Sequence, residues 1–243
     1  MNEKLYIHEF IHIILHNRAN YMHHMTANWS PIAQEERHQL CYGVWGTLGS
    51  TGRWPEVVNM WEEDGFDGMA SSFGIETGHA SLQDPKLAKW WAKAATFRSG
   101  GVDRLMVPAP WTRTIEELVA DGVRGEVYAH EFVTVAPGAA ADFLELVRAK
   151  AVDAYARYNI VLAGAFRTAL IDDSECLLLW AIPTWQDWAD LEKAHYSGAL
   201  DDWKNARGAM TRTFQRTLLN DAPLSPFLIG RQPSRDDRTD WED

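Results

Sequence analysis

The pentapeptide Tyr6-Ile7-His8-Glu9-Phe10 (YIHEF) recurs as Tyr128-Ala129-His130-Glu131-Phe132 (YAHEF). Each copy lies in an apolar, β-rich run, LYIHEFIHI and VYAHEFVTV. The flanking sequence repeats at nearly the same spacing, because Gly43–Thr47 (GVWGT) matches Gly164–Thr168 (GAFRT) and Glu56–Trp61 (EVVNMW) matches Glu175–Trp180 (ECLLLW). We therefore interpret the chain as a tandem duplication, which has to be recognised before a fold is assigned.

The order of predicted elements is the same in both halves. Strict alternation of side chains over residues 4–14 is typical of a strand, and a helix over 17–34 follows, with Pro31 expected to disturb its end. The first half continues with strands at 39–48 and 56–61, helices at about 65–73 and 84–97, and a strand at 102–107. The second half has strands at 126–135, 160–169, 174–181 and 213–219, with helices at 138–158, 184–194 and 199–210.

Each half therefore predicts a β-α-β-β-α-β ferredoxin-like unit of the α+β class. Such a sheet carries its helices on one face, so two sheets in one chain can cover each other's open faces and form an intramolecular dimeric α+β barrel. We place the first repeat at residues 1–111, a linker at 112–125, the second repeat at 126–229, and a polar, loosely held tail at 230–243. Trp241 could anchor this tail.

Composition excludes several classes of partner. The net charge of −11 argues against nucleic acid and against an anionic membrane surface. No apolar run reaches the roughly 20 residues of a membrane helix, and no signal peptide is apparent. Cys41 and Cys176 lack metal spacing and are expected to be reduced and buried, which suits a cytoplasmic protein. The 12 tryptophans suit a pocket for a small apolar or aromatic molecule.

Two segments of the first half carry a family resemblance. GRWPEVVNMWEEDGFDGMA (Gly52–Ala70) and DPKLAKWWAKAATFRSGGVDRLMVPAPW (Asp84–Trp111) resemble the NIPSNAP-like proteins of the dimeric α+β barrel superfamily. Met60 stands where the family usually has Leu, and Trp111 where it has Phe. The resemblance implies the barrel fold. We expect that two such barrels can associate further as a homodimer. Relatives on this fold include cofactor-independent monooxygenases, lyases, isomerases and haem-dependent enzymes, as well as members without assigned chemistry.

One face of the repeated strand is expected to point into the barrel lumen. In the first copy this face carries Tyr6, His8, Phe10 and His12, and in the second Tyr128, His130, Phe132 and Thr134. A pseudo-twofold axis would bring His8 and His130 to the same cavity. Imidazole suits acid–base chemistry, although each histidine could simply hydrogen-bond a tyrosine or a carbonyl. Trp45 and Phe166 occupy matching positions and could wall this cavity.

The opposite face of the strand carries Glu9 and Glu131 among aliphatic residues. A carboxylate there has to be paired or protonated. One interpretation is an ion pair with an arginine or lysine, or exposure at the sheet edge. The other is that the register is inverted or bulged, which would make Glu9 the base. Asn59, polar in an apolar strand, could orient a substrate carbonyl or make an edge-strand hydrogen bond.

Metal and haem sites are less well supported. His8, His12 and His16 are spaced four apart, which on a strand separates neighbours by roughly 13 Å, too far for one ion. We therefore predict no metal. A lumen histidine could ligate haem, but nothing such as CxxCH marks one.

The predicted function is an enzyme without a tightly bound cofactor, a lyase, an isomerase or a monooxygenase, acting on a small apolar or aromatic metabolite. His8 or His12 would move a proton, Tyr6 and Asn59 would orient the substrate, and Trp45 and Trp61 would line the pocket of the first repeat. The second candidate is a haem protein with His8 or His130 as ligand. The third is a non-catalytic binding or interaction module whose lumen is filled by its own tryptophans.

Overall fold

The computed structural model describes residues 1–170 and 173–241. Its first half contains β1 (Leu5–Ile13), α1 (Arg18–His23), a π-helical segment (His24–Trp29), α2 (Ser30–Arg37), β2 (Leu40–Thr47), β3 (Glu56–Glu63), α3 (Gly65–Thr77), α4 (Ala88–Ala95) and β4 (Arg98–Pro108). After α5 (Ile115–Ala120), the second half contains β5 (Val127–Val135), α6 (Ala140–Leu146), a π-helical segment (Val147–Ala151), α7 (Val152–Ala156), β6 (Val161–Thr168), β7 (Glu175–Ile182), α8 (Trp185–Ser197), α9 (Asp201–Met210) and β8 (Thr211–Asp221). A short helix, α10 (Pro226–Ile229), precedes the tail.

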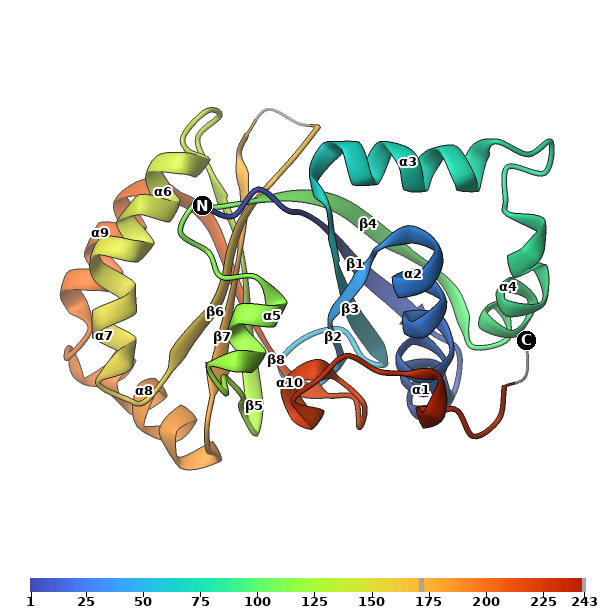
Figure 1. Ribbon diagram of the computed structural model, residues 1–243. Coiled ribbons are helices and arrows are strands. Elements are labelled where there is room, and N and C mark those ends of the chain that lie inside the picture. The colour runs from blue at the N-terminus through green and yellow to red at the C-terminus, as the bar shows by residue number, and fades with distance from the viewer. Residues whose placement is uncertain (171–172, 242–243) are drawn as a thin grey trace.

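The strands form one closed barrel in the order β1-β3-β2-β8-β5-β7-β6-β4. Each half contributes a sheet with ferredoxin-like order, and the sheets join where β2 pairs with β8 and where β4 pairs with β6. Helices α1–α4 lie outside one sheet and α6–α9 outside the other (Figure 1). The predicted single-chain α+β barrel is confirmed, because each open sheet face is covered by the other sheet.

The first helical region extends further than predicted. Pro31 was expected to disturb its end, yet helical geometry continues through Arg37. Proline lacks an N–H and is tolerated in the first turn of a helix. Pro31 occupies the first turn of α2, directly after the π-helical segment. The corresponding helix of the second half also contains a π-helical segment, so the two halves share this irregularity.

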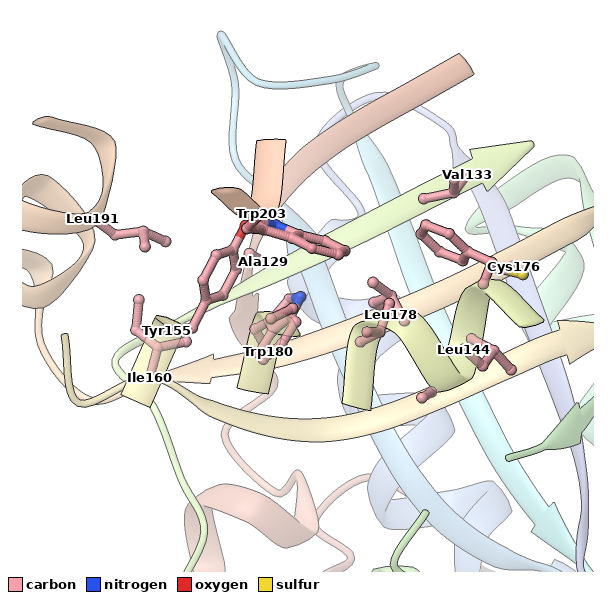
Figure 2. Close-up of a cluster of buried hydrophobic side chains, with 14 of the residues drawn as sticks. Ala129, Val133, Leu144, Tyr155, Ile160, Cys176, Leu178, Trp180, Leu191 and Trp203 are labelled. Atoms are coloured by element: carbon pink, nitrogen blue, oxygen red, sulfur yellow. The ribbon is translucent and has the colours of Figure 1, made fainter. Parts of the chain in front are cut away.

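Three clusters of buried side chains hold the fold together. One lies between the second sheet and α6–α9, where the rings of Tyr155 and Trp180 are 4.5 Å apart and Trp203 packs nearby (Figure 2). A second lies between the first sheet and its own helices. The third fills the lumen, and residues of α5 and α10 join it, so these two short helices cover one end of the barrel (Figure 1).

The tail is packed against the first repeat, and the expectation that it is loosely held is wrong. The side chain of Gln232 both accepts from the N–H of Cys41 and donates to its carbonyl, at 2.9 Å each. The Trp241 ring lies 5.3 Å from the His24 ring. The tail thus binds the backbone of β2 through Gln232 and covers an aromatic surface with Trp241, the residue that the sequence offered as an anchor.

Candidate active site

The two repeated histidines meet inside the lumen. His8 and His130 are 0% and 2% exposed, and their Nε2 atoms form a hydrogen bond of 2.8 Å. Phe10 and Phe132 flank the pair, with the Phe10 ring 4.9 Å from that of His8. Because one imidazole must donate and the other accept, the bond requires at least one neutral ring. Burial, followed by the charges of His130 and Arg104, lowers the pKa of His8, and burial lowers that of His130 to about 3.

A pH-dependent stability follows from this pair. A histidine with a lowered pKa in the folded state contributes stability above its unfolded pKa, and this contribution is lost as the pH falls toward the folded pKa. His130→Gln removes one such group. Between pH 6.5 and about 4.5, we expect the wild type to lose about 2–3 kcal/mol more unfolding free energy than the variant. Urea titrations at each pH measure the difference. The exposed-site variant His16→Gln should instead follow the wild type, and equal slopes for all three proteins would contradict the assignment.

The rest of the predicted lumen site is a packed core. Tyr6, Trp45, Tyr128 and Phe166 are at most 1% exposed and contact one another through their rings. The Tyr6 hydroxyl donates to Glu62 at 2.8 Å. These side chains fill the space that the sequence interpretation reserved for a substrate. The remaining opening, a cavity of about 210 Å³ at one mouth of the lumen, is lined by Phe10, His12, His130 and Phe132 among others.

Asn59 and Trp61, predicted to share the lumen pocket, lie on the opposite face of the sheet. In β3 they alternate with Val58 and Met60, which point into the lumen. Asn59 is paired with Glu9 of β1, so both side chains are directed toward the helices. The prediction of a single pocket is therefore wrong, because it combined residues from two faces of one sheet.

A larger cavity lies on this helix-covered face of the first repeat. It has a volume of about 490 Å³ and opens between strands β1, β3 and β4 and helices α2, α3 and α4. We call it the Glu9 pocket. Its walls carry both aromatic and charged side chains, among them Glu9, Trp29, Arg37, Trp61, Phe73, Glu76, Trp90, Trp91, Arg98, Asp103 and Arg104. Its size lies within the range of about 300–1,000 Å³ typical of small-molecule sites, whereas the lumen mouth is smaller.

Glu9 is held in the pocket by two donors. Its Oε2 accepts from Trp61 Nε1 at 2.7 Å and from Asn59 Nδ2 at 2.9 Å. Asn59 also donates to the Tyr21 hydroxyl at 2.8 Å, which fixes the amide. Both donors to Glu9 reach the same oxygen, and within residues 1–170 and 173–241 none reaches Oε1. The carboxyl group is therefore oriented but keeps one oxygen for a ligand.

The surroundings of Glu9 raise the pKa of its carboxyl group. Glu9 of β1 pairs with Asp103 of β4 in the sheet register, so two acidic residues are neighbours. Burial raises the pKa of Glu9, and the Asp103 charge raises it further, whereas the hydrogen bonds from Trp61 and Asn59 oppose the shift. Burial also raises the pKa of Asp103, against the effect of Arg98. Two adjacent carboxyl groups that resist joint ionisation are suited to receiving and returning a proton.

The second repeat carries an ion pair at the corresponding place. Glu131 accepts from Trp180 Nε1 at 3.0 Å, as Glu9 does from Trp61, but its register partner is Arg216. Arg216 donates to Glu131 through Nε at 2.8 Å and Nη2 at 2.6 Å. The ion pair with an arginine that was predicted for both glutamates is therefore present at Glu131. Glu9 has an acid where its counterpart has this arginine.

Asp103 is the residue that sequence reasoning missed. A partial signal was available, because the aligned strands EVVNMW and ECLLLW already differ at Asn59 and Leu178. The decisive difference, Asp103 against Arg216, lies in strands β4 and β8, whose sequences are too dissimilar to align by eye. The predicted register of β1 is correct. Glu9 is a candidate active-site residue because the large cavity lies on the helix-covered face of the sheet, toward which its side chain points.

The pairing of His8 with His130 does not fit the predicted axial ligation of a haem by either of these residues. The Nε2 atoms of His8 and His130 bind each other, and the residues lining the Glu9 pocket include no histidine. His24, close to the pocket, is engaged through both ring nitrogens with Trp90 and Asn28. Among residues 1–170 and 173–241, no group of three or more His, Cys, Asp or Glu side chains could hold a metal ion.

Comparison with known proteins supports the fold. No family model matches the sequence, and no curated protein matches it. A candidate monooxygenase from Lactobacillus acidophilus NCFM has a similar structure, with a TM-score of 0.57 and 9% identity over 96% of this chain and 97% of that one. A candidate monooxygenase from Fusobacterium nucleatum matches with a TM-score of 0.53 and 9% identity, over 90% and 92%. An anthrone oxidase-like protein matches with a TM-score of 0.50 and 10% identity, also over 90% and 92%.

At such low identity the likeness shows the architecture alone, and fold does not determine chemistry. The chain has the dimeric α+β barrel fold, with both halves of the barrel in one polypeptide. Within the described residues, none of the helices combines the length and the apolar character needed to cross a membrane.

Proposed function

We propose that the protein is an enzyme that removes a proton from a carbon atom beside a carbonyl group in a small apolar or aromatic metabolite, without a tightly bound cofactor. Glu9 is the base, Asp103 shares its proton, and Asn59 and Trp61 position the carboxyl group. The observation that supports the proposal is the Glu9–Asp103 pair in an aromatic pocket, where the second repeat has a closed ion pair.

The residues of the Glu9 pocket provide the features that such a reaction needs. Aromatic side chains in the wall offer an apolar surface to the substrate, and the burial of Glu9 makes its charge sensitive to its neighbours. Arg98, also in the wall, can face a developing oxyanion. The resulting carbanion is the common first intermediate of isomerisation, of elimination and of oxygenation by O₂. The resemblance to NIPSNAP-like proteins and the monooxygenase-like structures are compatible with this group of reactions.

Proton exchange tests the proposal without knowledge of the full reaction. We would incubate the protein in D₂O with a panel of aromatic carbonyl compounds and follow loss of the α-proton by NMR. Because a positioned base contributes roughly 10²–10⁴-fold, Glu9→Gln should lower the exchange rate by about that factor. Asp103→Asn should shift the pH profile, because it removes the neighbouring charge that raises the pKa of Glu9.

Glu56→Gln is the matched control. It removes a carboxylate at the lumen mouth, beside His12, and should leave exchange unchanged. Full exchange in Glu9→Gln would refute the role of Glu9, and loss in Glu56→Gln or His12→Gln would move the site to the lumen mouth. A visible haem absorption band in the purified protein would favour the haem alternative.

A further inference from the structure

A second cavity of comparable size lies on the far side of the molecule. Its volume is about 520 Å³, and it opens between strand β8 and helices α8 and α9, beside Ser50 and Thr51 of the β2–β3 loop. Helices α8 and α9 cover the second sheet, opposite α3 and α4, so this cavity is separate from the Glu9 pocket (Figure 1). We call it the α8–α9 pocket.

The charged side chains of this pocket are mostly cationic. Lys204, Arg207 and Arg216 line it, against the single carboxylate of Glu192. Arg216 forms ion pairs with Glu131 (Nη2 to Oε1, 2.6 Å) and with Glu192 (Nη1 to Oε1, 2.7 Å). Lys204 donates to the His195 carbonyl at 2.8 Å and reaches Asp201 at 3.4 Å. Two of the three cations that line this pocket therefore have carboxylate partners.

Arg207 is the cation that lacks a counter-ion. Its guanidinium carbon lies 3.9 Å from the centre of the Phe214 ring, and no carboxylate of the described residues forms an ion pair with it. The ring holds the guanidinium group in place but leaves its N–H groups without an anionic acceptor. A stacked arginine with free donors is suited to bidentate recognition of a carboxylate or phosphate group.

His195 is half-buried among these cations. Burial, and then the charges of Arg216, Arg207 and Lys204, lower its pKa to about 4. Its Nε2 lies 3.3 Å from both Arg216 Nη2 and the Tyr155 hydroxyl. The neutral imidazole therefore adds no charge of its own. Lys204 and Arg207 line the same cavity, so an anion bound there would be attracted by both positive charges.

The remaining walls suit a flat apolar group. Trp188, Tyr196 and Phe214 line the cavity, and its volume exceeds that of a bare phosphate ion. We propose that the α8–α9 pocket binds a small aromatic molecule carrying a carboxylate or phosphate group. Arg207 and Lys204 bind the oxyanion, and the aromatic body packs against Trp188 and Phe214.

Calorimetry on the full chain with three probes tests this site. Phenyl phosphate combines both features, inorganic phosphate carries only the charge, and phenol carries only the ring. We expect phenyl phosphate to bind more tightly than either of the others. Because a charge-assisted hydrogen bond is lost, Arg207→Gln should weaken phenyl phosphate binding about tenfold, and Lys204→Gln should also weaken it.

Arg212→Gln is the matched control, because it removes the same charge from an exposed position on strand β8, outside the pocket. It should bind phenyl phosphate like the wild type, and so should Glu9→Gln, which separates this site from the proposed active site. Absence of phenyl phosphate binding at millimolar concentration would overturn the proposal. Equal affinities of Arg207→Gln and Arg212→Gln, with both variants folded by circular dichroism, would overturn it as well.

Discussion

Replacing Glu131 by Gln is expected to destabilise the protein by about 3 kcal/mol, whereas the same replacement of Glu9 should leave stability unchanged or raise it. Glu131 is fully buried and binds Arg216, whose side chain is only 14% exposed. Removal of one partner from a buried ion pair leaves the other charge uncompensated, which costs about 3–5 kcal/mol. Glu192 still contacts Arg216 at 2.7 Å, so the lower end of this range applies.

Glu9 differs because its neighbour is an acid. Its pKa is raised by burial and by Asp103, so the folded state holds a proton that the unfolded state releases. The stability contributed by the neutral form is lost as the pH rises through the folded pKa. Glutamine mimics the protonated group, and the Glu9→Gln variant should therefore gain stability relative to the wild type as the pH is raised from 5 to 8, by urea denaturation. Equal losses in both variants would show that the two glutamates have equivalent environments.

Gly43→Ala is expected to cost about 3 kcal/mol, because β2 has no room for a methyl group at this position. A Cβ atom on Gly43 would lie 2.1 Å from two ring atoms of Trp45. Trp45 is 1% exposed and is confined by the rings of Tyr128 and Phe227, so it cannot move away. A Cβ atom on Gly164 would likewise lie 2.3 Å from a ring atom of Phe166. In both halves, a glycine therefore leaves the space that an aromatic side chain of the lumen occupies.

Thermal and urea unfolding of four variants, Gly43→Ala, Trp45→Leu, the double variant and Gly208→Ala, would test this explanation. Gly208→Ala is the control, because a Cβ there meets nothing within 4 Å and the residue lies in helix α9. It should stabilise the protein by about 0.5–1 kcal/mol. The double variant Gly43→Ala/Trp45→Leu should lose less than the sum of the two single changes, because the smaller side chain makes space. Additive losses would place the strain elsewhere.

The sequence pattern that recurs in the two halves of the chain predicted the barrel. Both halves contain matching strands, YIHEF with YAHEF and GVWGT with GAFRT, and the same period-2 alternation, so they are expected to form sheets with the same strand order. Each sheet has helices on one face only, and the two sheets therefore cover each other's open faces. Alternation also placed His8 and His130 on the lumen face and Glu9 and Glu131 on the helix face. These properties are local or repeated, so they can be read from the order of the residues.

Only the tertiary structure decided which face holds open space. Alternation predicts which residues of a strand share a face of the sheet. The volume of any cavity on that face depends on the packing of large side chains from distant strands and helices. Trp45, Tyr128 and Phe166 fill most of the lumen, whereas α3 and α4 leave a cavity over Glu9. The partners of the two glutamates are set by register with strands far along the chain, where Asp103 faces Glu9 and Arg216 faces Glu131. The residue that faces each glutamate depends on which distant strand pairs with it and in which register, and the alternation within a single strand does not specify this.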